Sequence, residues 1–149
     1  MRLIIGLAGL PSHRRPRLTS NVRPTQLPQF QLLSASGSDL ELTYEITKEA
    51  MGEYVVQTWG AWDEGEQREK HRLNFNPSTH RIVVVSTGAQ IGLVAVEEEA
   101  SYLWLVKLYL RRSYQGKGLG SALLRQVIVE AAELGKPVRL RVLRVNVAA

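Results

Sequence analysis

The stretch best suited to chemistry spans residues 114–121, where three glycines fall within five positions. These glycines are Gly116, Gly118 and Gly120. An apolar run precedes the stretch at 103–110 and another follows at 122–129, an order that predicts a strand, a glycine turn and a helix. Such a turn brings unpaired backbone N–H groups to a helix N-terminus, so we expect it to bind an anion such as a phosphate.

Two common phosphate-binding motifs do not fit this stretch. A nucleotide P-loop needs a Lys-Ser/Thr pair after its last glycine, whereas Lys117 precedes the last two glycines. The dinucleotide fingerprint needs glycine at its sixth place, which is Ser121 when counted from Gly116. A third pattern, Gln/Arg-x-x-Gly-x-Gly, is met by Gln115 and the last two glycines. The alternative, a connection without a ligand, is disfavoured because ordering several glycines costs backbone entropy.

Composition excludes several kinds of catalytic site. The chain has 149 residues, which favours one domain, and it contains no cysteine. Disulfides, thiolate metal sites and a covalent thioester on the enzyme are therefore excluded. The histidines His13, His71 and His80 share no metal-ligand spacing, so no metal site is expected.

The net charge of +5 is concentrated at the N-terminus. Residues 1–38 hold five arginines and no acidic residue, whereas residues 39–149 hold 14 basic and 14 acidic residues. We expect residues 1–28 to be a disordered basic extension, because prolines interrupt them and no targeting signal fits well. The neutral body argues against nucleic acid as a partner. No apolar run is long enough to span a membrane, so no membrane partner and a cytoplasmic location are expected.

The elements around the glycine turn follow from apolar periodicity and turn residues. Strands are predicted at 29–33, 81–86, 91–97, 102–110 and 138–143, and helices at 43–59, 63–73 and 118–134. The 102–110 strand is apolar at nearly every position except Lys107, so it should be central and covered on both faces. The 138–143 strand follows a crossover helix and should therefore run parallel to it.

Residues 108–146, which read LYLRRSYQGKGLGSALLRQVIVEAAELGKPVRLRVLRVN, resemble the acetyl-CoA-binding core of the GNAT superfamily of N-acetyltransferases. The glycine signature is short, but the strand, helix and strand around it make the resemblance strong. The order of elements from about residue 30 onward fits as well. The resemblance implies an α/β (α+β) fold, with a mixed, mostly antiparallel sheet flanked by helices, and an N-acetyltransferase domain over residues 29–149.

The resemblance implies a role for each part of the signature. Backbone N–H groups of the glycine turn would hold the CoA pyrophosphate, and the end of the preceding strand would pair with the pantetheine arm. One N–H of that strand would polarise the acetyl carbonyl. Lys117 and Arg125 would either help to neutralise phosphate or be solvated charges. The implied CoA-binding residues are Leu108, Tyr109, Leu110, Gln115, Gly116, Lys117, Gly118, Leu119, Gly120, Ser121 and Asn146.

The implied reaction transfers the acetyl group of acetyl-CoA to a primary amine, which attacks the thioester directly. A carboxylate near the splayed strand ends would accept the amine proton. Glu97, Glu64 and Asp63 are candidates for this general base, and each has a surface carboxylate as its alternative reading. The aromatic residues that would line the acceptor pocket or, as the better-supported alternative, pack in the core are Trp59, Trp62 and Tyr54.

The chain departs from the family pattern at its C-terminus. After the 138–143 strand the family has a further helix, which commonly carries a tyrosine that protonates the CoA thiolate, and then further strands. No tyrosine follows Tyr114, so this general acid is absent and the domain is expected to be C-terminally incomplete. An exposed apolar edge at 138–145 would then favour association, including a homodimer. The alternative function is a degenerate, catalytically weak CoA-binding or regulatory module of the same fold.

Overall fold

The elements around the glycine turn are described by a computed structural model over residues 27–141. Most of the predicted basic extension therefore lies outside the described residues, as do Asn146 and the far end of the predicted 138–145 edge. The strands are β1 (Phe30–Ser34), β2 (His80–Val85), β3 (Gln90–Glu98), β4 (Leu103–Leu110) and β5 (Val138–Leu140). The α-helices are α1 (Leu40–Trp59), α2 (Glu64–Asn74) and α3 (Leu119–Glu133). The strands and helices predicted within this range are all present, with small differences at their ends.

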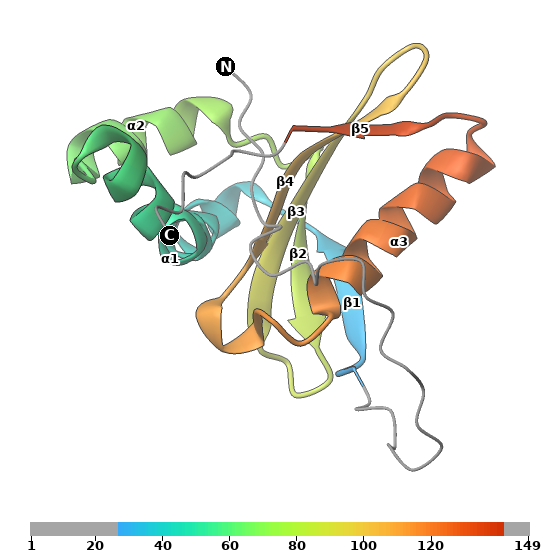
Figure 1. The fold of residues 1–149 in the computed structure, drawn as a ribbon, viewed down its shortest axis with the longest axis horizontal. Coiled ribbons are helices and arrows are strands. Elements are labelled where there is room, and N and C mark those ends of the chain that lie inside the picture. The colour runs from blue at the N-terminus through green and yellow to red at the C-terminus, as the bar shows by residue number, and fades with distance from the viewer. Residues whose placement is uncertain (1–26, 142–149) are drawn as a thin grey trace, which may run out of the picture.

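The strands form one mixed sheet in the order β1-β2-β3-β4-β5 (Figure 1). The first three pairings are antiparallel. Short turns join β2 to β3 and β3 to β4, whereas α1 and α2 lie between β1 and β2. β4 and β5 pair in parallel, because α3 carries the chain back between them. This mixed and mostly antiparallel sheet confirms the predicted fold class.

Helices cover both faces of the sheet, α1 and α2 on one and α3 on the other (Figure 1). A larger apolar core packs under α3 and a smaller one under α1, so the prediction that β4 is covered on both faces is confirmed. The core under α3 contains Val83, Val85, Ile91, Val94, Leu105, Leu108, Leu110, Leu119, Leu123 and Val127. The core under α1 contains Ile46, Met51, Leu93 and Tyr109.

Polar contacts fix where the helices begin and how they lie on the sheet. Asp63 is the N-cap of α2, and its carboxylate accepts a hydrogen bond of 2.8 Å from the backbone N–H of Glu66. On the other face, Arg81 of β2 donates two hydrogen bonds, of 2.9 and 3.0 Å, to the carboxylate of Glu130 on α3. Such a two-point contact holds α3 in a defined orientation over the sheet.

The pairing between β4 and β5 is short. Residues 103–105 pair with residues 138–140, and the described part of β5 ends there. A bulge falls at Val106, which has no partner in the β3–β4 register. Among the described residues, β4 therefore has no strand neighbour on its outer side from Val106 to Leu110. This part of the strand leads directly into the glycine turn.

Candidate functional site

The glycine turn presents a row of unpaired backbone N–H groups. Gly116 and Gly118 have φ angles of +73° and +83°, which only glycine adopts without strain. Gly118 is the N-cap of α3, and the first helical bond runs from the N–H of Ala122 to its carbonyl, at 3.1 Å. Within the described chain, the N–H groups of residues 116–121 therefore have no intramolecular acceptor. This arrangement provides a set of N–H donors for an anion at a helix N-terminus.

Gln115 joins this turn to the end of β4. Its side-chain amide donates a hydrogen bond of 2.8 Å to the carbonyl of Leu110, and its own N–H donates to the carbonyl of Arg112 at 3.1 Å. The short 3-10 helix η2 (Arg112–Tyr114) thus lies between two anchored points. The predicted signature residue Gln115 therefore helps to set the position of the loop.

Glu49 of α1 fastens the same connection from the other side. Its carboxylate accepts hydrogen bonds from the Arg111 guanidinium at 3.0 Å and from the backbone N–H of Arg112 at 3.2 Å. The Arg112 guanidinium pairs with Glu53, one helical turn further on, at 2.6 Å. Sequence reasoning missed these acids. The signal that could have found them is an acidic pair at i, i+4 on a helix, facing two adjacent arginines.

The open side of β4 displays alternate backbone groups. The N–H of Arg111 donates to the carbonyl of Ile91 on β3, at 2.8 Å. Because backbone direction alternates along a strand, the N–H of Tyr109 also faces β3, whereas those of Leu108 and Leu110 face away from it. The bond from Gln115 to the carbonyl of Leu110 agrees with this direction. Of the three strand residues in the implied set, two thus present their N–H groups to the open side.

Several of the described cations, two of them near the glycine turn, have no carboxylate partner. Most described lysines and arginines make an ion pair with a carboxylate. Among the described residues, those without a carboxylate partner are Lys107, Lys117, Arg125, Arg139 and Arg141. Lys117 lies in the glycine turn and Arg125 on the second turn of α3, and both are exposed. Both could therefore meet an anion at the turn without breaking an existing contact.

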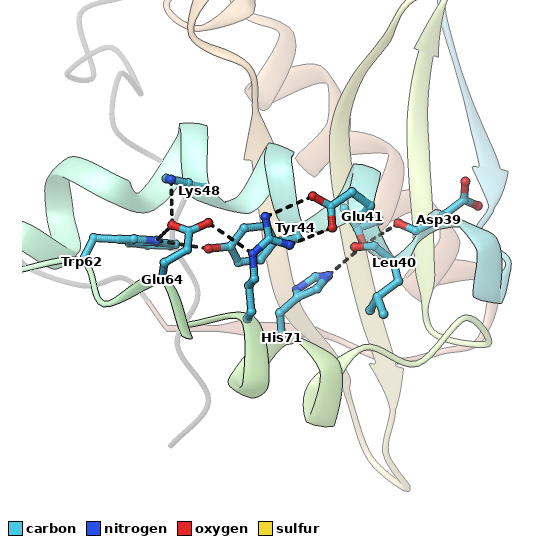
Figure 2. Close-up of polar contacts among 10 residues, drawn as sticks. Asp39, Leu40, Glu41, Tyr44, Lys48, Trp62, Glu64 and His71 are labelled. Carbon is cyan, nitrogen blue, oxygen red and sulfur yellow. Dashed lines mark hydrogen bonds and ion pairs between the residues drawn. The ribbon is translucent and has the colours of Figure 1, made fainter. Parts of the chain in front are cut away.

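Glu64, one predicted general base, belongs to a polar network between α1 and α2 (Figure 2). Its carboxylate accepts hydrogen bonds from Lys48 at 2.7 Å and Trp62 at 3.1 Å, and the guanidinium of Arg68 lies 3.3 Å away. The bond from Lys48, with a contribution from Tyr44, lowers the pKa of Glu64. This environment argues against Glu64 as a proton acceptor, because its charged form is already stabilised.

The other predicted candidates on this side lie at separate places. Asp63 is engaged as the α2 N-cap. Tyr54 and Trp62 pack against the core under α1, whereas Trp59 is 58% exposed. Tyr54 and Trp62 thus occupy positions that agree with core packing. The exposure of Trp59 gives no support to an acceptor pocket lined by all three residues.

Glu97, the remaining general-base candidate, lies on β3 directly opposite Trp104 of β4. Its neighbour Val96 packs under α3, so the alternation of the strand puts Glu97 on the face of α1 and α2. It is half-buried. Trp104 and Leu108 are four residues apart, so Glu97 lies roughly 13 Å along the sheet from the open N–H of Leu108.

Between residues 27 and 141, no group of histidine, cysteine, aspartate and glutamate side chains could hold a metal ion. No helix in the same range is both long and apolar enough to cross a membrane.

A family model described as the acetyltransferase (GNAT) family matches residues 41–149. The comparison with curated proteins finds no match. Among solved structures, the fold is similar to that of the PaiA N-acetyltransferase from Thermoplasma acidophilum in complex with coenzyme A. That match has 20% identity and a TM-score of 0.60, and it covers 80% of this chain and 82% of that one.

Two more solved structures have the same fold. The ribosomal-protein-S18-alanine N-acetyltransferase from Escherichia coli is 19% identical, with a TM-score of 0.57, over 80% of this chain and 70% of that one. A GNAT family acetyltransferase from Brucella melitensis in complex with acetyl-CoA is 14% identical, with a TM-score of 0.52, over 74% and 73% of the two chains. At these identities the similarity shows the fold.

Proposed function

The chain belongs to the acetyltransferase (GNAT) family, and from this premise we propose that it is an acetyl-CoA-dependent N-acetyltransferase that acts on a primary amine. The observation that carries the proposal is the row of unpaired N–H groups at residues 116–121, which follows the open side of β4 after the short helix η2. An elongated ligand with an anionic end and an amide-bearing arm fits these two surfaces together. CoA has both features.

The donor would be held by two parts of the chain. The N–H groups of residues 116–121 and the N-terminus of α3 would bind the pyrophosphate, helped by the exposed charges of Lys117 and Arg125. The open N–H groups of Leu108 and Leu110 would pair with the pantetheine arm in the manner of an added strand. Bound there, acetyl-CoA supplies the activated acetyl group.

The chain's own contribution to the reaction would be electrostatic. The N–H of Leu108 faces the open side of β4, where it can donate to the acetyl oxygen as negative charge develops on it. A positioned donor of this kind contributes roughly 3–4 kcal/mol in comparable sites. The chain has no cysteine, so a route through an acylated cysteine is closed and the amine would attack the thioester directly.

The amine must lose a proton, and we propose Glu97 as the acceptor of that proton. Glu97 is half-buried on the face of α1 and α2. Glu64 is less suited because its contacts with Lys48 and Tyr44 lower its pKa, and Asp63 caps α2. Because Glu97 lies roughly 13 Å along the sheet from Leu108, we propose that it acts through water or through a long acceptor.

The proposal is tested by following release of the CoA thiol from acetyl-CoA in the presence of a panel of primary amines. We expect amine-dependent release by the full chain, and its loss in a Gly118→Asp variant, whose carboxylate would repel the pyrophosphate. Binding of acetyl-CoA without release with any amine would instead support the binding-module alternative.

A further inference from the structure

Three adjacent strands carry a polar row on the face of α1 and α2. His80 of β2 pairs with Ala95 of β3, and Ala95 pairs with Lys107 of β4. The next residue along β4 from Lys107 is Leu108, which packs under α3, so the side chain of Lys107 lies on the opposite face. Ala95 contributes only a methyl group between the two longer side chains. The row therefore has polar groups at both ends and little side-chain volume in its middle.

Several polar atoms in and beside this row have no hydrogen-bond partner among residues 27–141. Among the described residues, Lys107 makes no hydrogen bond or ion pair. His80 is 3% exposed; its Nδ1 donates to the carbonyl of Asn76 at 2.8 Å, which leaves Nε2 as a buried acceptor without a partner. The indole N–H of Trp104, on the same face three residues before Lys107, is also buried without a partner. Unpaired buried polar atoms are costly, so a ligand that satisfies them is expected to bind here.

The charges around these atoms indicate the charge of the ligand. The Arg139 guanidinium lies 4.6 Å from the centre of the Tyr102 ring, and the Arg141 guanidinium lies 5.9 Å from that of Trp104. Neither arginine has a carboxylate partner among the described residues. Burial lowers the pKa of Lys107 to about 8, so its amine is still mostly protonated at neutral pH. Cations and an N–H donor therefore converge on the face that borders the open side of β4.

The opposite face does not admit a polar molecule. There Leu105, Leu108 and Leu110 pack against α3 in the larger apolar core. An acceptor that reaches the N–H of Leu108 must therefore come from the face of Lys107 and Trp104. The carboxylate of Glu97 lies on this face as well, opposite Trp104.

We propose that the amine acceptor carries a carboxylate, and that Lys107 and the Trp104 indole N–H bind this carboxylate, with Arg139 at the edge of the site. The inference rests on the proposed acetyltransferase function and specifies its substrate class. An amino acid or a comparable aminocarboxylate has both required charges. Its carboxylate meets the cations, and its ammonium group is left for Glu97 and for the unpaired Nε2 of His80.

Matched acceptor pairs test this inference. Initial rates of CoA thiol release are measured with lysine against cadaverine, phenylalanine against phenethylamine, and methionine against 3-(methylthio)propylamine. Each pair differs only in the carboxylate. A hydrogen-bonded charge pair of this kind corresponds to about a tenfold to hundredfold preference in kcat/KM for the amino acid. Equal values within every pair, a preference for the decarboxylated amines, or no acetylation of any carboxylated amine would overturn the inference.

Variants at Lys107 and Trp104 test whether these residues cause the preference for a carboxylated acceptor. Lys107→Met keeps the length of the side chain and removes its charge, so it should raise KM for the carboxylated member of each pair at least tenfold and leave the decarboxylated member nearly unchanged. Trp104→Phe should show a smaller change of the same kind. Lys70→Met is the control, because Lys70 is exposed on α2 and pairs with Glu66. Equal losses for both members in Lys107→Met would show a purely structural role and would contradict the inference.

Calorimetric titration with acetyl-CoA distinguishes failure of the proposed substrate class from failure of the proposed acetyltransferase function. If the full chain binds acetyl-CoA and acetylates amines without regard to a carboxylate, only the substrate class is wrong. If the chain does not bind acetyl-CoA, the proposed function fails and the inference fails with it.

Discussion

The side-chain amide of Gln115 donates a hydrogen bond of 2.8 Å to the main-chain carbonyl of Leu110, across the connection between β4 and the glycine turn. This bond links the two surfaces that the proposed donor must contact together. The carbonyl of Leu110 faces the open side of β4. Within the described chain, no strand pairs with β4 on this side at Leu110. The Gln115 side chain therefore helps to set the position of the loop relative to the strand, together with the contacts of Glu49 and Glu53.

Gln115→Ala is expected to weaken CoA binding without unfolding the protein. Loss of this bond frees the loop and leaves a carbonyl unpaired, at a cost of about 1–2 kcal/mol, which corresponds to a fivefold to thirtyfold higher Kd. Calorimetric titration with CoA measures it. Gln57→Ala, at an exposed position on α1, is the matched control and should bind as the unmodified chain does. An unchanged Kd for Gln115→Ala would show that the loop is held by its other contacts.

Two glycine-to-alanine changes should act in opposite directions. Gly118 has a φ angle of +83°, so Gly118→Ala should lower the free energy of unfolding by roughly 1–2 kcal/mol and also weaken CoA binding. Gly52 lies inside α1 with ordinary φ and open space at its Cβ position. Gly52→Ala should therefore raise the free energy of unfolding by about 0.5–1 kcal/mol. Urea denaturation measures both; equal effects would contradict the assigned loop conformation.

The two described histidines should make the protein less stable in acid. Burial is the main cause that lowers the pKa values of His71 and His80 from 6.5 to about 4. Between pH 6.5 and pH 4 the unfolded chain binds more protons than the folded chain, so the free energy of unfolding falls as the pH falls through this range. The loss is roughly 2–3 kcal/mol per histidine. His80→Gln should reduce the slope of this free energy against pH by about half, as measured by urea denaturation at several pH values, and an unchanged slope would contradict it.

Lys107→Met should raise the free energy of unfolding at pH 7. The native state holds a half-buried, charged Lys107 that has no carboxylate partner in the described part of the chain, and the variant removes that charge. The expected gain is roughly 1–3 kcal/mol. The lowered pKa adds a pH test, because the unmodified chain should gain stability between pH 8 and about pH 10.5, where only the unfolded lysine is still protonated. A variant that is less stable at pH 7 would show that Lys107 has a stabilising partner.

Substitution of Glu97 and substitution of Glu64 should have different effects on kcat. Glu97→Gln removes the proposed proton acceptor and should lower kcat by a factor of about 10²–10⁴. Glu64→Gln should lower stability instead, because Glu64 holds Lys48 and Trp62, and should have a much smaller effect on kcat. The comparison is made with the best amine of the panel. A larger loss of kcat in Glu64→Gln would reverse the assignment.

The fold could be predicted because local signals and connection rules agree. Turn residues and β-branched runs located β2 and β3, and the crossover through α3 required β5 to run parallel to β4. The glycine turn could be recognised because its conformation is encoded in its own residues, as the positive φ angles of Gly116 and Gly118 show. These parts depend on contacts close in sequence or on a general rule.

The remaining features depend on contacts between residues distant in sequence. Glu49 reaches Arg111 across 62 positions, and no local pattern fixes that pairing. The sequence shows Lys107 only as an exception in an apolar strand. Its place in one row with His80 depends on the register of three strands, which includes the bulge at Val106. Sequence reasoning likewise left Glu64 among the candidate bases, because the cations that surround it come from two different helices.

The central claim, that residues 116–121 bind the pyrophosphate of the acetyl donor, is tested most directly by NMR. The full chain labelled with ¹⁵N is titrated with acetyl-CoA, and the backbone amide resonances of Gly116, Gly118 and Gly120 are followed. The account predicts that the chemical shifts of these three amides change saturably with one common Kd, while the chemical shift of the Gly52 amide on α1 does not change. Saturable binding that leaves the three loop amides unchanged, or no binding at all, would contradict it.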